Sequence, residues 1–156
     1  MTNTKQELRF DSILFDIHAN SMKHLHQKLA DHISQLIGTP KQSILTHLTD
    51  AEKEENSAIG NGVAIPHMRL ERLTKPMIIF AKLEKAIDEK SADGIPIDLA
   101  CLVLSPDYEG NKHLQRLAMV SRAFKNDNFC QSLRATTSSM EVRQVMQTAK
   151  EGRLAA

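Results

Sequence analysis

One nearly continuous apolar run, Ile-Asp-Leu-Ala-Cys-Leu-Val-Leu at residues 97–104, constrains the fold of this chain most strongly. A strand with one solvated face alternates apolar and polar residues, whereas a strand covered on both faces is apolar almost throughout. Asp98 is the one interruption in the run. The run therefore predicts a central strand with a packed layer on each of its two faces.

The other apolar patterns place helices before and after a strand-rich middle. Short strands are predicted at residues 13–17, 63–65 and 77–83. Helical spacing and capping residues predict helices from Asn20 to Ile37, from a Thr39-Pro40 start, as a short piece from Thr49, and over residues 112–125, 129–133 and 142–149. We expect an α/β fold, a three-layer α/β/α sandwich in which helices flank a mixed central sheet.

The length of the chain predicts one domain. With 156 residues the chain can bury a substantial core. We expect this domain to span residues 12–150, after a polar and flexible lead-in over residues 1–11 and before a tail over residues 151–156.

Charge and aromatic content argue against nucleic acid as a partner. Lysine and arginine number 20 against 19 aspartates and glutamates, aromatics are 4% of residues, and tryptophan is absent. No apolar run is long enough to span a bilayer, and the first residues lack the apolar segment of a signal peptide. We therefore expect a cytoplasmic protein without direct membrane insertion, in which Cys101 and Cys130 are free buried thiols.

The segment Gly-Asn-Gly-Val-Ala-Ile-Pro-His at residues 60–67 is the best candidate for chemistry. Pro66 fixes the backbone and ends the predicted strand, so that His67 is expected at the mouth of a rigid turn. Imidazole titrates near neutral pH and is a competent nucleophile toward phosphorus or a proton shuttle. From the residues alone, a structural role for His67 as a turn residue with a backbone hydrogen bond is equally open.

Other reactive arrangements are not expected. His24, His26 and His32 share one predicted helix, where His24 and His26 point to nearly opposite sides, and solvated helix histidines are the simplest interpretation. The chain has no Cys-x-x-Cys, His-Glu-x-x-His, P-loop or Gly-x-Ser-x-Gly motif, and the glycines at 60 and 62 lack the third glycine of a dinucleotide fingerprint. We expect neither a metal site nor a cofactor.

Three blocks of sequence carry a family resemblance. They are Ile-Gly-Asn-Gly-Val-Ala-Ile-Pro-His at 59–67, Asp-Gly-Ile-Pro-Ile-Asp-Leu at 93–99 and His-Leu-Gln-Arg-Leu-Ala-Met-Val-Ser-Arg at 113–122. Their order and spacing resemble the enzyme IIA domains of the mannitol, fructose and nitrogen-regulatory class of the phosphotransferase system, over about residues 12–150. The wording of the third block is most similar to the nitrogen-regulatory branch.

This resemblance implies a phosphoryl carrier that forms a phosphohistidine. His67 would accept a phosphoryl group from the phosphohistidine of HPr or of its nitrogen-branch paralogue, and His113 would be a second histidine that donates to the phosphoryl group. Regulatory target proteins are the other implied partners. The loop expected to bind the phosphoryl group comprises Ser57, Gly60, Asn61 and Gly62.

Three departures from the family pattern are Ala51 with the acidic run that follows it, Met68 after His67, and Glu89, which stands where the family usually has a phenylalanine in the loop before Asp93. The family typically has an arginine sixteen residues before the active histidine, and Ala51 stands at that position. An acidic run with Glu52, Glu54 and Glu55 follows, which is unfavourable for an anionic group. The glycine that normally follows the histidine is Met68 here, which is expected to narrow access.

These departures keep a second function open. The alternative is a non-catalytic regulatory protein of the same fold that acts by binding partner proteins, with phosphoryl transfer impaired. Arg69, Lys53 and Arg72 are cations that could replace the missing charge, although solvated surface charge is their simpler interpretation.

Overall fold

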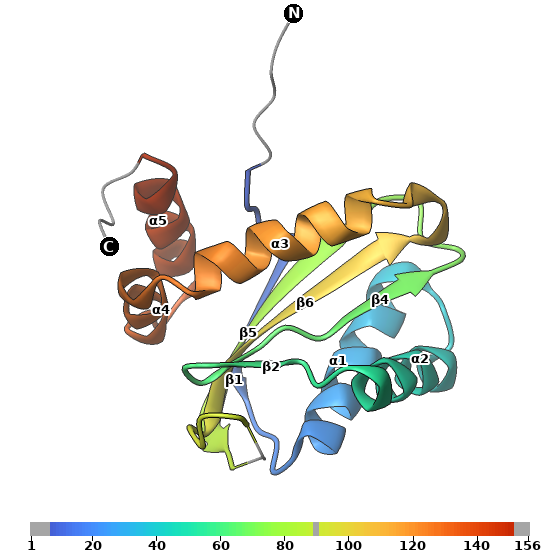
Figure 1. Cartoon of the computed structure of the whole chain (residues 1–156), viewed down its shortest axis with the longest axis horizontal. Helices are drawn as coiled ribbons and strands as arrows, with labels where there is room; N and C mark the ends of the chain where they lie inside the picture. Colours follow the sequence, from blue (N-terminus) through green and yellow to red (C-terminus); the bar gives the residue numbers. More distant parts are fainter. Residues whose placement is uncertain (1–6, 89–90, 152–156) are drawn as a thin grey trace, which may run out of the picture.

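The computed structural model describes residues 7–88 and 91–151 and contains a mixed six-stranded sheet (Figure 1). The strand order is β1-β5-β6-β3-β2, and β4 also pairs with β6. The strands are β1 Ser12–Ile17, β2 Ala58–Gly60, β3 Val63–Ala64, β4 His67–Leu70, β5 Met77–Ile87 and β6 Ile97–Pro106. The helices are α1 Met22–Ile37, α2 Lys41–Glu54, α3 Lys112–Phe124, α4 Asp127–Arg134 and α5 Ser139–Lys150, and a short 3₁₀ turn, Asp107–Glu109, precedes α3.

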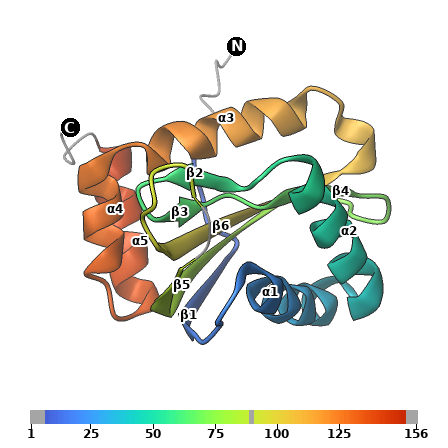
Figure 2. The ribbon, with the colours of Figure 1, turned by 60° about the horizontal axis from the view of Figure 1, so that its bottom comes forward.

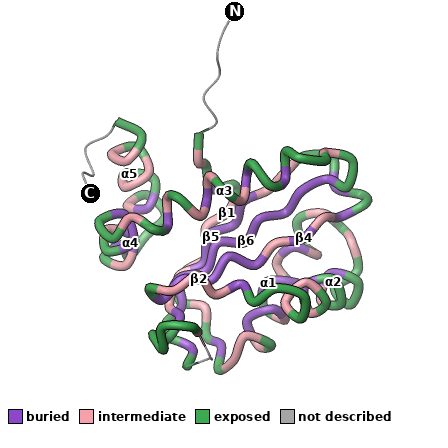
Figure 3. The backbone as a smooth tube through the Cα atoms, viewed as in Figure 1, coloured by how far each residue is buried: buried purple, intermediate pink, exposed green. Residues whose placement is uncertain are grey.

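The apolar run of the sequence forms the central strand β6, as predicted. β5 pairs with one edge of β6 in antiparallel register, while β3 and β4 pair in succession with the other edge in parallel register. The buried residues of this strand lie along the middle of the molecule (Figure 3). Burial of each large apolar side chain contributes about 1.5–3 kcal/mol to stability.

The predicted three-layer sandwich is confirmed. Alternate residues of β6 belong to two separate cores: Leu99, Cys101 and Val103 pack with α3, α4 and α5, whereas Leu102 and Leu104 pack with α1 and α2. The two helical layers are seen on opposite sides of the sheet (Figure 2). Cys101 and Cys130 are free and buried, as the sequence predicted.

Helix starts differ from the prediction at three places. Ser21 rather than Asn20 caps α1, because the Ser21 side chain accepts a hydrogen bond from the backbone of His24. Pro40 is the N-cap of α2, which has no side-chain cap there, so the cap predicted at Thr39 is wrong. The separate helical piece predicted from Thr49 is also wrong, because α2 continues through that residue to Glu54.

The packed domain begins before residue 12, where the sequence placed its boundary. The ring of Phe10 is buried and stacks on Phe80 with the ring centroids 5.0 Å apart. The backbone nitrogen of Asp11 donates to Ile78, and the carboxylate of Asp11 accepts from the same residue. The segment just before β1 therefore packs on the core and is tied to β5 by the hydrogen bonds of Asp11. Residues 1–6 and 152–156, which complete the predicted lead-in and tail, lie outside the described residues, and so does Glu89.

The turn between β2 and β3 requires its glycines. Gly60, Asn61 and Gly62 all have positive φ, at 94°, 60° and 78°. The backbone nitrogen of Asn61 donates to Asp93 over 2.7 Å, and its carbonyl accepts from Arg134. A Cβ atom on Gly62 would lie 2.8 Å from a guanidinium nitrogen of Arg134. The turn is thus fixed both by its backbone conformation and by a close approach.

We predict that Gly62→Ala destabilises the protein more than Gly94→Ala. Gly94 also has a positive φ, 71°, but a Cβ there would meet no atom within 4 Å. Gly94→Ala should therefore cost about 1 kcal/mol from backbone strain alone, and Gly62→Ala roughly 2–4 kcal/mol because the clash is added. Urea unfolding of both variants measures the difference. Equal losses would show that the contact with Arg134 does not constrain the turn.

Candidate functional site

His67 is the first residue of β4, not the last residue before a turn. Pro66 cannot donate a hydrogen bond, but its carbonyl accepts from the backbone nitrogen of Val103 over 2.9 Å. The chain therefore continues to pair with β6 after Pro66, and His67 lies opposite Val103. The His67 side chain is 28% exposed. Its backbone is fixed by the sheet while its ring remains accessible.

Met68 does not narrow access to His67, contrary to the expectation from the sequence. Side chains alternate along β4, and Met68 and Leu70 are buried in the core with α1 and α2. His67 and Arg69 lie on the opposite side of the strand. Because Met68 points away from the ring of His67, this departure from the family pattern leaves the site open.

The structure brings His67 and His113 together, although they are 46 residues apart. Nδ1 of His67 lies 3.3 Å from Nε2 of His113, and the ring centroids are 5.3 Å apart. The other ring nitrogen of His67, Nε2, lies 3.8 Å from the carboxylate of Glu55. Nδ1 of His67 is therefore engaged by His113, whereas Nε2 faces Glu55.

A series of buried polar contacts holds Nδ1 of His113, the ring nitrogen that does not contact His67. This nitrogen lies 2.5 Å from Oγ of Ser105, which also accepts a hydrogen bond of 2.6 Å from Nη1 of Arg116. Arg116 in turn forms a 2.9 Å ion pair with Glu109. Ser105 is fully buried, and His113 and Arg116 are 4% and 6% exposed.

Burial and nearby positive charge keep His113 neutral. Burial lowers the pKa of His113 to about 4, and the charges of His67, Arg69 and Arg116 act in the same direction. Arg69 contributes from β4, where its guanidinium donates to the carbonyl of Gly110 just before α3. At neutral pH His113 therefore carries one proton on one of its two nitrogens.

A small pocket on the other side of His67 contains Ala51. Leu48, Ala51, Glu52, Glu55, Ser57, Pro66 and His67 line it. The position that holds arginine in the family thus adjoins His67, as the sequence comparison implied, but alanine brings no charge to the pocket. Glu52 and Glu55 make the lining acidic instead.

Ser57 lies at this pocket, with its hydroxyl already used. Glu52 accepts hydrogen bonds from both the backbone nitrogen and the hydroxyl of Ser57, over 2.9 and 2.8 Å. Burial alone would raise the pKa of Glu52, but the interaction with His26 and the hydrogen bonds from Ser57 outweigh it and lower the pKa. His26 is 3% exposed with Nε2 3.4 Å from Glu52, so the prediction that it is a solvated helix histidine is wrong.

Gly60, Asn61 and Gly62 are not brought to His67. Val63 pairs with Leu99 and His67 pairs with Val103, four residues further along β6, a separation of roughly 13 Å. The Asn61 amide is bound by Asp93, and the Asn61 side chain donates to Asp127. The predicted phosphoryl-binding role of this turn has no support in the geometry, because the intervening strand is extended and the turn contacts α4.

Sequence reasoning missed Ser105, Glu109 and Arg116. Two signals were present: Ser105 is a polar residue at the end of the apolar run, and Arg116 follows His113 by three residues, which places both on one helix face. Glu109 had no such signal, since its position depends on the 3₁₀ turn between β6 and α3.

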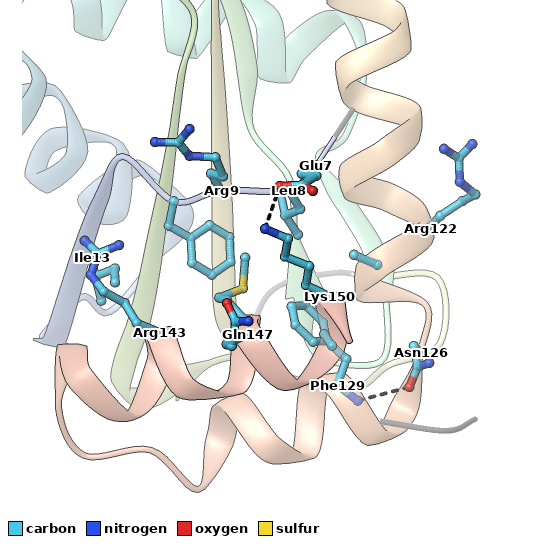
Figure 4. Close-up of a pocket in the computed structure, with 14 residues that line it drawn as sticks. Glu7, Leu8, Arg9, Ile13, Arg122, Asn126, Phe129, Arg143, Gln147 and Lys150 are labelled. Carbon is cyan, nitrogen blue, oxygen red and sulfur yellow. Dashed lines mark hydrogen bonds and ion pairs between the residues drawn. The ribbon is translucent and has the colours of Figure 1, made fainter. Parts of the chain in front are cut away.

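A larger groove lies elsewhere, between residues 7–13 and the helices α3, α4 and α5 (Figure 4). Phe10, Phe129, Arg122 and Arg143 are among its lining residues, and Lys150 pairs there with Glu7 over 3.2 Å. Among the described residues that line it there is no histidine, cysteine or serine. Within residues 7–88 and 91–151, no three His, Cys, Asp or Glu side chains are grouped to hold a metal ion. The histidine pair is therefore the candidate site.

A family model described as "Phosphoenolpyruvate-dependent sugar phosphotransferase system, EIIA 2" matches residues 8–149. The chain belongs to this family. The match covers every strand and almost all of the five helices, including both histidines of the site. It confirms the resemblance that the three sequence blocks carried.

The chain is also similar to individual proteins and solved structures. A nitrogen regulatory protein of Bradyrhizobium diazoefficiens is 35% identical over 136 residues, covering 87% of this chain and 89% of that protein. The crystal structure of nitrogen regulatory protein IIA-Ntr from Neisseria meningitidis has a TM-score of 0.79 at 24% identity, over 86% of this chain and 92% of that one. The Escherichia coli complex of enzyme IIAMtl with phosphorylated enzyme IIBMtl has a TM-score of 0.73 at 17% identity, over 90% and 97% of the two chains.

In the part of the chain that the structure describes, no helix is both long enough and apolar enough to cross a lipid bilayer.

We predict that His113 makes the stability of the protein sensitive to acid. The unfolded His113 takes up a proton near pH 6.5 and the folded His113 near pH 4, so the unfolded state binds more protons in this window. The free energy of unfolding should therefore fall by on the order of 2–3 kcal/mol as the pH falls through this window, and level off below it.

The variant His113→Gln isolates this effect. Urea unfolding of both proteins at several pH values should show a smaller loss for the variant, because other titrating groups are shared. An acid loss of the same size in both proteins would exclude His113 as its source.

Proposed function

We propose that this EIIA 2 protein is a phosphoryl carrier and regulator that accepts a phosphoryl group on His67 from HPr or from its nitrogen-branch paralogue. The observation that carries the proposal is the geometry of His67: Nδ1 is held by His113 while Nε2 faces a solvent-accessible pocket. The names of its relatives, which include nitrogen regulatory proteins and a IIA protein in complex with a phosphorylated partner, support the same function.

The reaction is a transfer between two imidazoles. Nε2 of His67 forms the new bond to phosphorus while the bond between phosphorus and the donor imidazole breaks, and that electron pair returns to the donor ring. Nε2 attacks with its in-plane lone pair, so the reacting tautomer of His67 carries its ring proton on Nδ1, the nitrogen directed at Nε2 of His113, and this proton is lost to solvent after the transfer. His67 then carries the phosphoryl group with Nδ1 still directed at His113.

In this geometry His113 orients the ring of His67. The sequence predicted that His113 donates to the phosphoryl group, but its Nε2 is directed at Nδ1 of His67 and not at Nε2. A hydrogen bond there holds Nε2 toward the pocket, which limits the rotation that would otherwise have to be frozen in the transition state. His113 is therefore proposed as a positioning residue for the acceptor.

The pocket favours slow transfer. Ala51 brings no positive charge, and the carboxylates of Glu52 and Glu55 lie on the side from which an anionic phosphoryl group arrives. Like charges at this distance raise the barrier. The same features favour the alternative function, a regulator of the same fold that binds partner proteins without accepting a phosphoryl group, and one experiment distinguishes the two.

The test is incubation with phosphoenolpyruvate, enzyme I and HPr or the nitrogen-branch paralogue, followed by intact mass measurement. We predict an acid-labile adduct of one phosphoryl group, lost in His67→Ala and retained in His47→Ala, which removes an exposed histidine on α2. No adduct on the unaltered protein would favour the alternative function. An adduct that persists in His67→Ala would refute the assignment of the acceptor.

We predict that Ala51→Arg accelerates transfer by about tenfold or more. A guanidinium at this position would offset Glu52 and Glu55 and neutralise the arriving group, and tenfold corresponds to about 1.4 kcal/mol of the barrier. Single-turnover rates measure the change. Thr46→Arg is the matched control, because it adds the same charge on an exposed part of α2 outside the pocket. Equal rates in both variants would exclude the missing charge as the limit.

A further inference from the structure

The groove between residues 7–13 and the helices α3, α4 and α5 lies apart from the histidine pair. It encloses about 720 Å³, which is within the roughly 300–1,000 Å³ of pockets that bind small molecules. Its lining on α3 begins at Arg122, in the last turn of that helix, whereas His113 lies in the first turn. The proposed phosphoryl acceptor therefore makes no use of this groove.

Half of the residues that line the groove are apolar. Phe10 and Phe129 are buried, whereas Leu8, Ile13 and Met146 are only partly buried against the core that contains α3, α4 and α5. The partly buried side chains leave apolar surface in contact with water. An apolar ligand that displaces this water gains free energy in proportion to the area it covers.

The charged residues of the groove are mostly cations. Arg9, Arg122, Arg143 and Lys150 line it, against one carboxylate, that of Glu7. Figure 4 shows Arg9 and Arg143 on one side, Arg122 on the other, and the ion pair of Lys150 with Glu7 between them. Within residues 7–88 and 91–151, none of the three arginines forms an ion pair. Unpaired positive charge thus adjoins the apolar surface.

The ion pair of Lys150 with Glu7 shows that a carboxylate is accepted in this groove. Nζ of Lys150 lies 3.2 Å from the Glu7 carboxylate, and the two side chains are 54% and 48% exposed. Water and salt weaken an ion pair that is this exposed, so another carboxylate can replace Glu7. Arg143 precedes Lys150 on α5 by seven residues, about two turns, so both cations face the groove from one side of the helix.

We propose that this groove binds a small amphipathic carboxylate. The apolar body of the ligand packs on Leu8, Ile13 and Met146, and its carboxylate binds Lys150 in place of Glu7. Arg143 adds positive charge that favours the anion. This site needs no phosphoryl transfer and goes beyond the function proposed for His67.

The test titrates the full chain with decanoate below its micelle concentration and follows the backbone ¹H–¹⁵N signals. Decanoate should bind saturably at one site per chain and shift the signals of residues 8–13, 122–126 and 143–150. Acetate carries the carboxylate alone, and decanol carries the apolar chain without the charge. Each should bind at least about tenfold more weakly, because it lacks one of the two sets of contacts.

Variants assign the charged contacts. Arg143→Gln should weaken decanoate binding by about threefold to tenfold. Lys28→Gln is the matched control, because it removes one exposed positive charge from α1, outside the groove, and it should leave binding unchanged. Glu7→Gln should strengthen binding by about threefold, since it removes the carboxylate that competes for Lys150. Backbone spectra verify that each variant is folded.

Two results would overturn the recognition of a carboxylate. One is the absence of saturable decanoate binding, and the other is decanol binding as tightly as decanoate, which would show a groove selective for apolar surface alone. Equal losses in Arg143→Gln and Lys28→Gln would also contradict the proposal, because net charge and not the groove would then be responsible. Weaker binding by Glu7→Gln would refute the exchange of carboxylates at Lys150.

Other occupants of the groove give distinct results. A dimer of the ligand-free chain in light scattering, with the groove signals protected, would assign the groove to a second copy and overturn the proposal. Binding to phosphatidylglycerol vesicles without binding of decanoate would assign it to a membrane surface and overturn it as well. His67→Ala should bind decanoate like the unaltered protein, so this test is independent of whether His67 accepts a phosphoryl group.

Discussion

The parallel pairing of β3 and β4 with one edge of β6 is the constraint on which the site depends. It continues across Pro66 because the proline carbonyl still accepts from Val103, and it fixes the backbone of His67 in the sheet. The same strand β6 ends near Ser105 and leads through a 3₁₀ turn into α3, which carries His113. Both histidines and the serine behind them are thus positioned by one strand whose two faces are buried.

Charge is distributed unequally around the histidine pair. On the buried side of the histidine pair, Arg116 forms an ion pair with Glu109 and donates a hydrogen bond to Ser105. Arg116 therefore acts on His113, and the pocket on the other side of His67 stays acidic. Arg69 joins β4 to the residue before α3 through the carbonyl of Gly110 and lowers the pKa of His113. As the proposed phosphoryl acceptor, His67 is therefore well oriented and weakly assisted by positive charge.

The layered fold could be predicted from a local pattern, because the apolar run at 97–104 required two covering layers. The histidine pair could be predicted only through the resemblance of the three blocks to the enzyme IIA family, which implied that His67 and His113 meet. The polar chain behind His113 could not be predicted, because it depends on how α3 packs against the end of β6. The turn at Gly60–Gly62 was assigned to the site because it is near His67 in sequence, whereas extension of the strand places it near α4.

The most direct test uses ³¹P–¹H NMR of the phosphorylated protein to determine which ring nitrogen of His67 carries the phosphoryl group. Phosphorus on Nε2 of His67 couples through three bonds to both ring protons, Hδ2 and Hε1, whereas phosphorus on Nδ1 couples in this way to Hε1 alone. The account predicts both couplings on His67, because Nδ1 is occupied by His113 and Nε2 faces the pocket. Coupling to Hε1 alone, or a phosphoryl group on another residue, would contradict it.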